Sequence, residues 1–292
     1  MGEQQALRTL AEAAEETGIP APLVRRLWRS LGFAIPAADE SVFTDTDLDA
    51  LRLMQQGVES GVLDADSEVR LARAVGQTMA RLADWQVSTL AIELPESVQD
   101  RFEQLLVYVW RRHLGAAAAR HAALVEPGEQ QSVTITVGFA DIVQFSALSN
   151  ELGDDRIGDL VEIFETRASD TVTHQGGRVI KTLGDAVLFV ADDAVTAMDI
   201  AHGIIDVIGV DARMPDVRLG LATGPVILRF GDVFGPPVNL AARLTGIARR
   251  NRVITDDATA QKLPVERYET RALTARPVRG FGVLEPIAVR RL

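Results

Sequence analysis

The sequence contains no cysteine, which excludes a disulfide framework, a zinc site built on thiolates and a thiol nucleophile. It has only two lysines, Lys181 and Lys262, so arginine carries nearly all of the positive charge. Aromatic residues make up 5% of the chain, which leaves the packing of any core to aliphatic side chains. No stretch approaches the roughly 18 consecutive apolar residues of a membrane span, and the polar, acidic start is unlike a secretory signal. We therefore expect a cytoplasmic protein that makes no membrane contact.

The chain nevertheless has the material for substantial cores. Hydrophobic residues make up 47% of its 292 residues, enough for one large domain or two ordinary ones. The net charge is −11, and residues 1–130, with 12 arginines and 20 acidic residues, contribute −8 of it. A nucleic-acid-binding domain usually carries a basic excess. The charge therefore argues against a nucleic-acid partner.

Residues 1–124 carry the 3.6-residue spacing of helices throughout and are expected to form an all-α domain. Asp45 or Thr46 is available as the N-cap of a helix that ends near Gly61. Two longer helices are expected at about 65–92 and 96–123, on either side of a proline.

A polar stretch with Pro and Gly, residues 125–131, is the expected linker. Beyond it, residues 132–292 alternate between strand and helix patterns. A strand and a polar turn precede a helix, and two short strands follow, joined by a hairpin turn at Gly184 and Asp185. A second helix and further strands complete an α+β domain with the ferredoxin-like βαββαβ order. We expect separate strands for VRLGLAT and VILRF and a loop for GDVFGPP.

Two aspartates lie where a strand meets a turn. Asp141 follows the first strand of the second domain, and Asp185 lies in the hairpin turn. The first strand and the hairpin are neighbours in a ferredoxin-like unit, so the two carboxylates can converge, an arrangement that suits Mg²⁺. The alternative is that Asp185 only forms the turn and Asp141 only caps a helix.

A third polar group follows in GDVFGPPVNLAARL. Asp232 precedes a helix on which Asn239 and Arg243 are four residues apart and therefore share one face. An arginine can stabilise phosphoryl charge, and an asparagine can hydrogen-bond a sugar. The alternative is an ordinary helix start with a solvated arginine.

The segments VGFADIVQFSALS, GGRVIKTLGDAVLFV and GDVFGPPVNLAARL, in this order and spacing, resemble the catalytic domain of class III adenylyl cyclases. The resemblance covers about 131–262. It implies that Asp141 and Asp185, with Ile142 beside them, bind two divalent ions, Mg²⁺ or Mn²⁺, on the triphosphate of ATP. It implies an enzyme that forms 3′,5′-cyclic AMP and pyrophosphate.

The resemblance also implies how the substrate is bound. Lys181 and Asp232 match the pair that reads adenine, which explains a lysine in so arginine-rich a chain. Asn239 matches the residue that orients the ribose, and Arg243 the residue that stabilises charge at the α-phosphorus.

The loop after Asp141 departs from the family pattern. Relatives often have Gly-Phe-Thr there, in a loop whose backbone amides touch phosphate, whereas this chain has Gln144, Phe145 and Ser146. Phe145 and Ser146 are expected to bind substrate. Gln144 replaces a glycine and is expected to restrict the loop.

The family's site is shared across a dimer, so the resemblance implies a homodimer with two equivalent sites. The metal-binding residues Asp141 and Asp185 then come from one subunit. The partner subunit contributes the remaining residues of that site, Lys181, Asp232, Asn239 and Arg243. Two alternatives remain open: a catalytically silent dimer that senses nucleotide, and a cyclase with a DNA-binding N-terminal module. A P-loop or Rossmann enzyme is excluded, since neither GxxxxGK[ST] nor a GxGxxG after a strand occurs.

The N-terminal half is similar to the helical regulatory domain of mycobacterial pH-sensing adenylyl cyclases, and its opening also resembles a MerR-type helix-turn-helix with Arg25, Arg26 and Arg29 on the recognition helix. Two of the four histidines, His113 and His121, lie in the helix that leads into the second domain. They are about 80° apart around that helix. We expect this helix to respond to pH; the alternative is two ordinary surface histidines.

Overall fold

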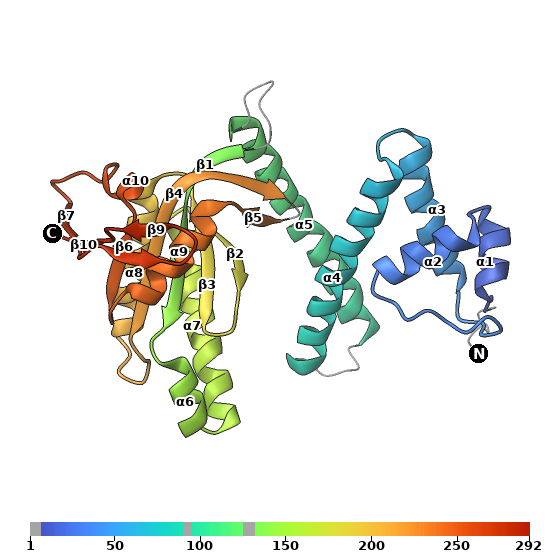
Figure 1. The fold of residues 1–292 in the computed structure, drawn as a ribbon. Coiled ribbons are helices and arrows are strands. Elements are labelled where there is room, and N and C mark those ends of the chain that lie inside the picture. The colour runs from blue at the N-terminus through green and yellow to red at the C-terminus, as the bar shows by residue number, and fades with distance from the viewer. Residues whose placement is uncertain (1–6, 90–94, 125–131, 230) are drawn as a thin grey trace. The chain divides into compact units, whose positions relative to one another are not determined.

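The computed structural model describes residues 7–89, 95–124, 132–229 and 231–292. The chain divides into two compact units, Met1–Arg111 and Arg112–Leu292 (Figure 1). The division falls within one long helix, and the expected linker 125–131 lies outside the described residues. Within the described part of the chain, no helix is both long enough and apolar enough to cross a membrane.

The N-terminal region is helical, as the spacing predicts. Thr9 and Gly18 bound the first helix: Thr9 forms a capping box with Glu12, and Gly18 adopts the left-handed conformation with φ 72°. The N-cap of the third helix is Thr44, whose side chain accepts from the amide of Asp47, so the expectation of Asp45 or Thr46 was wrong by one or two residues. The helices are α1 (Leu10–Thr17), α2 (Ala21–Ser30), α3 (Asp45–Glu59), α4 (Ala65–Thr89) and α5 (Glu96–Leu124).

The core of this region is formed by α1, α2 and α3 together with the start of α4. Leu27, Leu48 and Phe43 are fully or almost fully buried in it. Helix α4 approaches the end of α2 so closely that a Cβ on Gly76 would lie 2.3 Å from the carbonyl oxygen of Leu31. Only glycine permits this contact.

One carboxylate is buried where sequence patterns give no warning. Glu68, near the start of α4, is 1% exposed, and neither of its carboxylate oxygens has a hydrogen-bond partner. Burial raises the pKa of Glu68, and the nearby charge of Arg26 only partly opposes this. Because the folded protein holds this proton more tightly than the unfolded chain, stability falls as pH rises from the ordinary carboxyl range through the raised pKa.

We predict that Glu68→Gln removes this pH dependence. Trp28, Trp85 and Trp110 are the only tryptophans, so tryptophan fluorescence during thermal unfolding reports on the helical region. The melting-temperature difference between variant and wild type should be smallest below about pH 4.5, the ordinary range of a glutamate, and should grow as pH rises. Asp84→Asn, an exposed change on α4, is the matched control. A pH-independent difference for Glu68→Gln would contradict the prediction.

The second unit is built on an eight-stranded sheet with the order β2-β3-β1-β4-β6-β10-β7, with β5 paired to β4. The path β1-α7-β2-β3-α8-β4 confirms the ferredoxin-like βαββαβ order. The elements are β1 (Ser132–Ile142), α6 (Phe145–Glu151), α7 (Asp154–His174), β2 (Arg178–Thr182), β3 (Ala186–Ala191), α8 (Ala194–Gly209), β4 (Val217–Arg229), β5 (Asp232–Phe234), α9 (Pro236–Ile247), β6 (Arg252–Thr255), α10 (Asp257–Ala260), β7 (Tyr268–Ala272), β8 (Arg276–Val278), β9 (Gly282–Leu284) and β10 (Ile287–Arg291).

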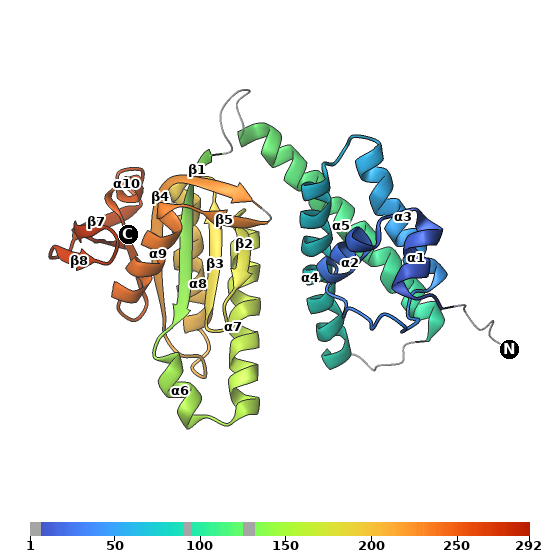
Figure 2. The same cartoon turned by 45° about the vertical axis from the view of Figure 1, so that its right-hand side comes forward.

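The two faces of this sheet are covered by different helices (Figures 1 and 2). Ala140 and Ile142 of β1 belong to the core that α7 and α8 cover, and Ile135 and Val137 belong to the core that α9 covers. Side chains alternate between faces along a strand, so Asp141 lies on the α9 face. Helix α9 can approach β4 only because of Gly220, where a Cβ would lie 2.3 Å from the backbone nitrogen of Thr245.

Three sequence expectations for this unit were wrong. The residues after β1 form the short helix α6 rather than a polar turn. VRLGLAT and residues 226–229 of VILRF belong to one continuous strand, β4, because the paired β1 runs beside it from Val217 to Ile227. Phe230 lies outside the described residues. Asp232 lies in the short strand β5 and not in a loop, since β5 turns back to pair with the end of β4.

Candidate active site

Asp141 and Asp185 lie side by side at one end of the sheet. Asp141 pairs in register with Ala186, the residue after Asp185, and the amide of Ile142 donates to the carbonyl of Asp185 over 3.0 Å. Burial raises the pKa of Asp141, and the neighbouring charge of Asp185 raises it further, against the opposing effect of Arg218. Adjacency of β1 and β3 therefore brings the two carboxylates together.

This pair fits a divalent cation. Two carboxylates that disfavour each other's charge are stabilised by a cation, and carboxylate oxygens are the ligands that Mg²⁺ takes alongside water and phosphate. The apolar side chain of Ile142 belongs to the core under α7 and α8, so its backbone carbonyl is the only ion ligand that this residue could offer. Among the described residues, no third His, Cys, Asp or Glu joins the pair to complete a protein-only metal cage. The remaining ligands would come from solvent or substrate.

Arg218 is a member of the site that sequence reasoning missed. It lies on β4 directly opposite Asp141. Its Nε and Nη2 atoms lie 2.7 and 2.5 Å from the same oxygen, Oδ2 of Asp141. The second carboxylate oxygen is therefore not engaged by Arg218. The signal for this contact is the β1–β4 register, which a sequence alone does not supply.

Lys181 and Asp232 form an ion pair within the chain. Lys181 Nζ lies 2.5 Å from Asp232 Oδ2, across from β2 to β5. Asp232 also accepts a hydrogen bond from the amide of Val233. Burial is the largest single influence and works against the charge of Asp232, but the hydrogen bonds from Lys181 and Val233 and the charge of Lys181 together outweigh it, so the pKa of Asp232 is lowered. The carboxylate of Asp232 is thus charged at neutral pH, and both side chains are partly open to solvent.

A bulge in β2 decides which way Lys181 faces. The register between β2 and β3 shifts between Val179 and Lys181, so that Lys181 lies opposite Leu188. Leu188 belongs to the core under α9. Lys181 and Asp141 therefore lie on the same face of the sheet.

Asn239 and Arg243 are exposed on α9, turned away from the sheet that this helix covers. The buried side of α9 carries Ala241, Leu244 and Thr245. In the described part of this unit, no hydrogen bond or ion pair joins Asn239 or Arg243 to Asp141 or Asp185. A single chain thus presents the aspartate pair and the α9 pair as separate groups.

The loop after Asp141 is held in an uncommon conformation. Gln144 has φ 60° and ψ 30°, the left-handed region that glycine occupies freely, and it forms the N-cap of α6. The Phe145 side chain packs against the core under α7 and α8, whereas Ser146 is exposed at the start of α6.

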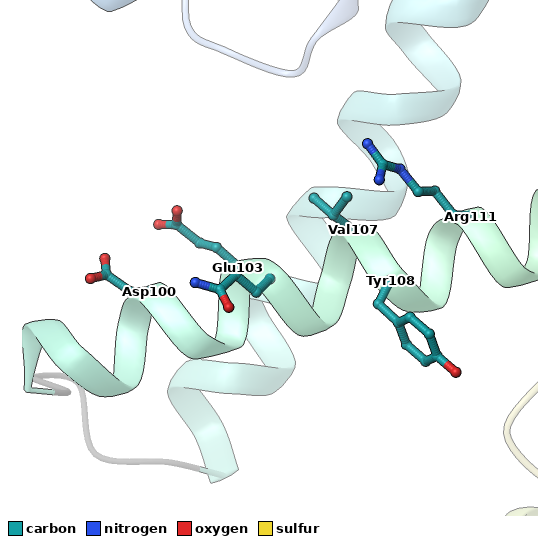
Figure 3. A pocket seen from close by; sticks show the side chains of 6 residues that line it. Asp100, Glu103, Val107, Tyr108 and Arg111 are labelled. Carbon is teal, nitrogen blue, oxygen red and sulfur yellow. The ribbon is translucent and has the colours of Figure 1, made fainter.

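A hollow elsewhere, on α5, does not have the features of a catalytic site. Its lining residues Asp100, Glu103, Val107, Tyr108 and Arg111 project from successive turns of one helix, and Figure 3 shows Tyr108 pointing away from Val107. Polar groups that converge on one point mark a reaction site, and these side chains diverge.

Comparison with known proteins identifies the family of the catalytic domain. Residues 128–288 match the family described as the adenylate and guanylate cyclase catalytic domain. An adenylate cyclase of Streptomyces coelicolor is 38% identical over 96% of this chain and 85% of that protein. The pH-sensitive adenylate cyclase of Mycobacterium tuberculosis is 28% identical over 90% of this chain and 72% of that protein.

Among solved structures, the catalytic core of a rhodopsin-guanylyl cyclase with converted specificity, in complex with ATPαS, is 25% identical with a TM-score of 0.51, and the match covers 55% of this chain and 97% of that one. The protein therefore belongs to the class III adenylyl cyclases, a helical N-terminal region followed by an α/β catalytic domain. Its activity is that of an adenylate cyclase. Catalytic domains of this class act as dimers that bind nucleotide, and the family generally uses divalent metals.

Proposed function

We propose that the chain forms 3′,5′-cyclic AMP from ATP at two equivalent sites of a homodimer, each built from both subunits. The observation that carries this proposal is the separation within one chain of the Asp141–Asp185 pair from Asn239 and Arg243 on α9. Each pair lacks what the other offers, a metal site on one side and groups for the ribose and α-phosphate on the other. Two copies of the chain would complete both sites by the same contacts.

The proposed chemistry assigns each residue one task. Asp141 and Asp185, with the backbone carbonyl of Ile142, would hold two divalent cations, Mg²⁺ or Mn²⁺, which when bound acidify the ribose 3′-hydroxyl and neutralise phosphate charge. Asn239 orients the ribose, and Arg243 donates to the oxygens of the α-phosphate as their charge grows. The 3′-oxygen bonds to the α-phosphorus while the bond from that phosphorus to the β-phosphate oxygen breaks. The products are cyclic AMP, pyrophosphate and one proton.

The loop 143–146 is proposed to complete the phosphate site. It begins where β1 ends at Ile142, and its last two residues open α6, so its backbone amides lie close to Asp141 in the sequence. The hydroxyl of Ser146 is exposed and available to a phosphate oxygen. Phe145 packs against the core under α7 and α8 and would anchor the loop to it.

The Lys181–Asp232 pair is proposed to select adenine. The ammonium has three donors, so it can keep its contact with Asp232 and still donate to adenine N1. The carboxylate can accept a further hydrogen bond, from the 6-amino group. Guanine presents a donor at N1 and an acceptor at O6. The ammonium of Lys181 would then face a donor, and the carboxylate of Asp232 would face an acceptor.

We predict that Lys181→Glu combined with Asp232→Cys lowers kcat/KM for ATP by about tenfold or more, as expected when two hydrogen bonds to the base are lost. Lys262→Glu, at the only other lysine, is the matched control and should leave ATP kinetics unchanged. Initial rates of cyclic AMP formation at varied ATP concentration provide the measurement. Unchanged kinetics in the double variant would mean that this pair does not read the base.

Exposed apolar side chains support the homodimer. Leu71, Val75 and Met79 of α4 are each about half exposed, as are Leu105 and Leu114 of α5. On α4 the three recur at four-residue intervals, which places them along one stripe of the helix. A second copy of the chain is a surface that would cover such residues.

We predict that mixing two inactive variants restores activity. Asp141→Ala and Arg243→Ala each disable both sites of a homodimer, whereas a mixed dimer keeps one intact site. Random pairing should recover roughly a quarter of wild-type cyclic AMP formation. A mixture of Asp141→Ala with Asp185→Ala is the control and should stay inactive, because both changes damage the same half-site. Failure of the first mixture, with mixed dimers demonstrated by differential tags, would overturn the shared-site proposal.

The helical region is proposed to regulate the catalytic domain in response to pH. His113 is exposed on α5, and the side chain of His121 lies outside what the structure describes. Histidine changes charge between about pH 5 and 8. Buried, unpartnered Glu68 is a second titratable group of the same region and makes the stability of that region depend on pH.

We predict that activity of the full chain varies more steeply between about pH 5.5 and 8, the range in which histidine titrates, than activity of residues 125–292. His113→Asn with His121→Asn should flatten the full-chain profile toward that of the segment. His174→Asn is the matched control, since it lies at the end of α7 in the catalytic domain. Three coincident profiles would exclude the histidine pair as the sensor.

Among the residues that the structure describes, no contact favours either alternative. A silent nucleotide-sensing dimer would have no use for Arg243 or for two converging aspartates. The DNA-binding hypothesis is weakened by an ion pair on α2, in which Arg26 lies 3.1 Å from Asp66. That pair places an acidic group beside one of the three arginines of the expected recognition helix.

A further inference from the structure

The described residues contain two non-glycine residues with positive φ, Gln144 at 60° and Asn251 at 53°. They are far apart in the sequence, yet both belong to one hydrogen-bonded cluster. Side chains other than glycine avoid this backbone region because Cβ crowds the neighbouring carbonyl. Such conformations persist where surrounding contacts hold them. The question is what holds Gln144, three residues after Asp141.

The contact on Gln144 comes from the turn after α9. Arg250 Nη2 donates to Gln144 Oε1 over 3.0 Å. The backbone carbonyl of Gln144 meanwhile accepts from the amides of Ala147 and Leu148, at 3.0 and 3.1 Å, which starts α6. The side chain and the backbone of Gln144 are therefore both engaged.

Asp216 joins the two sides of the cluster. Its backbone carbonyl accepts from the amide of Val143 at 2.9 Å. Its carboxylate accepts from Asn251 Nδ2 at 2.7 Å and lies 3.6 Å from Arg250 Nη1. Asn251 in turn accepts from the amide of Val217 through its side chain, at 3.1 Å, and donates from its own amide to the carbonyl of Val217, at 2.6 Å. The turn that carries Arg250 is thus fixed to the start of β4.

We propose that Arg250 is a positioning residue that holds loop 143–146, through Gln144, in the conformation that receives the phosphates of the nucleotide. Arg250 itself is 62% exposed and acts on the loop, not on the substrate. A glycine at position 144 would adopt the same φ without an anchor. Glutamine has a strained backbone at this point, and its amide side chain supplies the acceptor that Arg250 uses. The inference rests on the proposed role of loop 143–146 in binding phosphate.

The test is a double-mutant cycle between positions 144 and 250 in the full chain. Arg250→Ala should raise KM for ATP about threefold to tenfold, the size of effect expected for one hydrogen bond, with a smaller change in kcat. In the Gln144→Gly background, Arg250→Ala should produce no further rise in KM, because the loop no longer needs the anchor. Arg249→Ala removes the same charge from the adjacent exposed position and is the matched control.

Hydrogen exchange gives a readout that does not depend on catalysis. The amides of Val143, Ala147 and Leu148 are hydrogen-bonded within the cluster. Their exchange should accelerate in Arg250→Ala and return toward the wild-type rate in Gln144→Gly with Arg250→Ala. Equal exchange in wild type and Arg250→Ala would overturn the proposal that Arg250 holds loop 143–146, whether or not the enzyme is active.

Two kinetic outcomes would also overturn the proposal. An equal rise in KM on Arg250→Ala in both backgrounds would mean that Arg250 acts independently of Gln144. An unchanged KM in Arg250→Ala would mean that the contact has no effect on the nucleotide. Failure of the proposed function is distinct from both. Altered exchange in Arg250→Ala, with no effect of Ser146→Ala on KM, would retain the Arg250–Gln144 contact and would remove the Ser146 hydroxyl from phosphate binding.

Discussion

The antiparallel pairing of β1 with β3 on one side and β4 on the other is the constraint on which the active site depends. It sets Asp141 beside the hairpin turn that carries Asp185 and directly opposite Arg218. The carboxylate of Asp141 thus lies near the like charge of Asp185 in the turn before β3 and near the opposite charge of Arg218 on β4. A slip of one residue in either ladder would move Asp141 to the face that α7 and α8 cover.

Helix α9 depends on the same sheet. It lies against β4 at Gly220, where no side chain could be accommodated, and this close approach directs Asn239 and Arg243 outward. The turn after α9 then reaches the loop after Asp141 through Arg250. In the proposed dimer, loop 143–146 of a chain belongs to one active site and helix α9 of the same chain belongs to the other. Arg250 therefore connects parts of both sites.

The helical region poses a different physical problem. Most of its core is ordinary aliphatic packing around Leu27, Leu48 and Phe43, but Glu68 is buried without a partner. Such a group costs stability when it is charged, and it makes the region sensitive to pH. The helical region is proposed to sense pH. Because Glu68 is buried within that region, the stability of the region itself depends on pH.

Much of this protein could be predicted from the sequence, because helical spacing, strand alternation and turn residues are local signals. They predicted the helical region, the βαββαβ order and the hairpin turn that carries Asp185. They placed Asp141 just after its strand, whereas it is paired within β1, which runs to Ile142. Local signals failed where pairing between distant segments decides the outcome, as in the unbroken strand β4 and the placement of Asp232 in β5. Arg218, Glu68 and the Arg250–Gln144 contact could not be predicted at all. Register, burial and the meeting of two turns over a hundred residues apart exist only once the chain has folded.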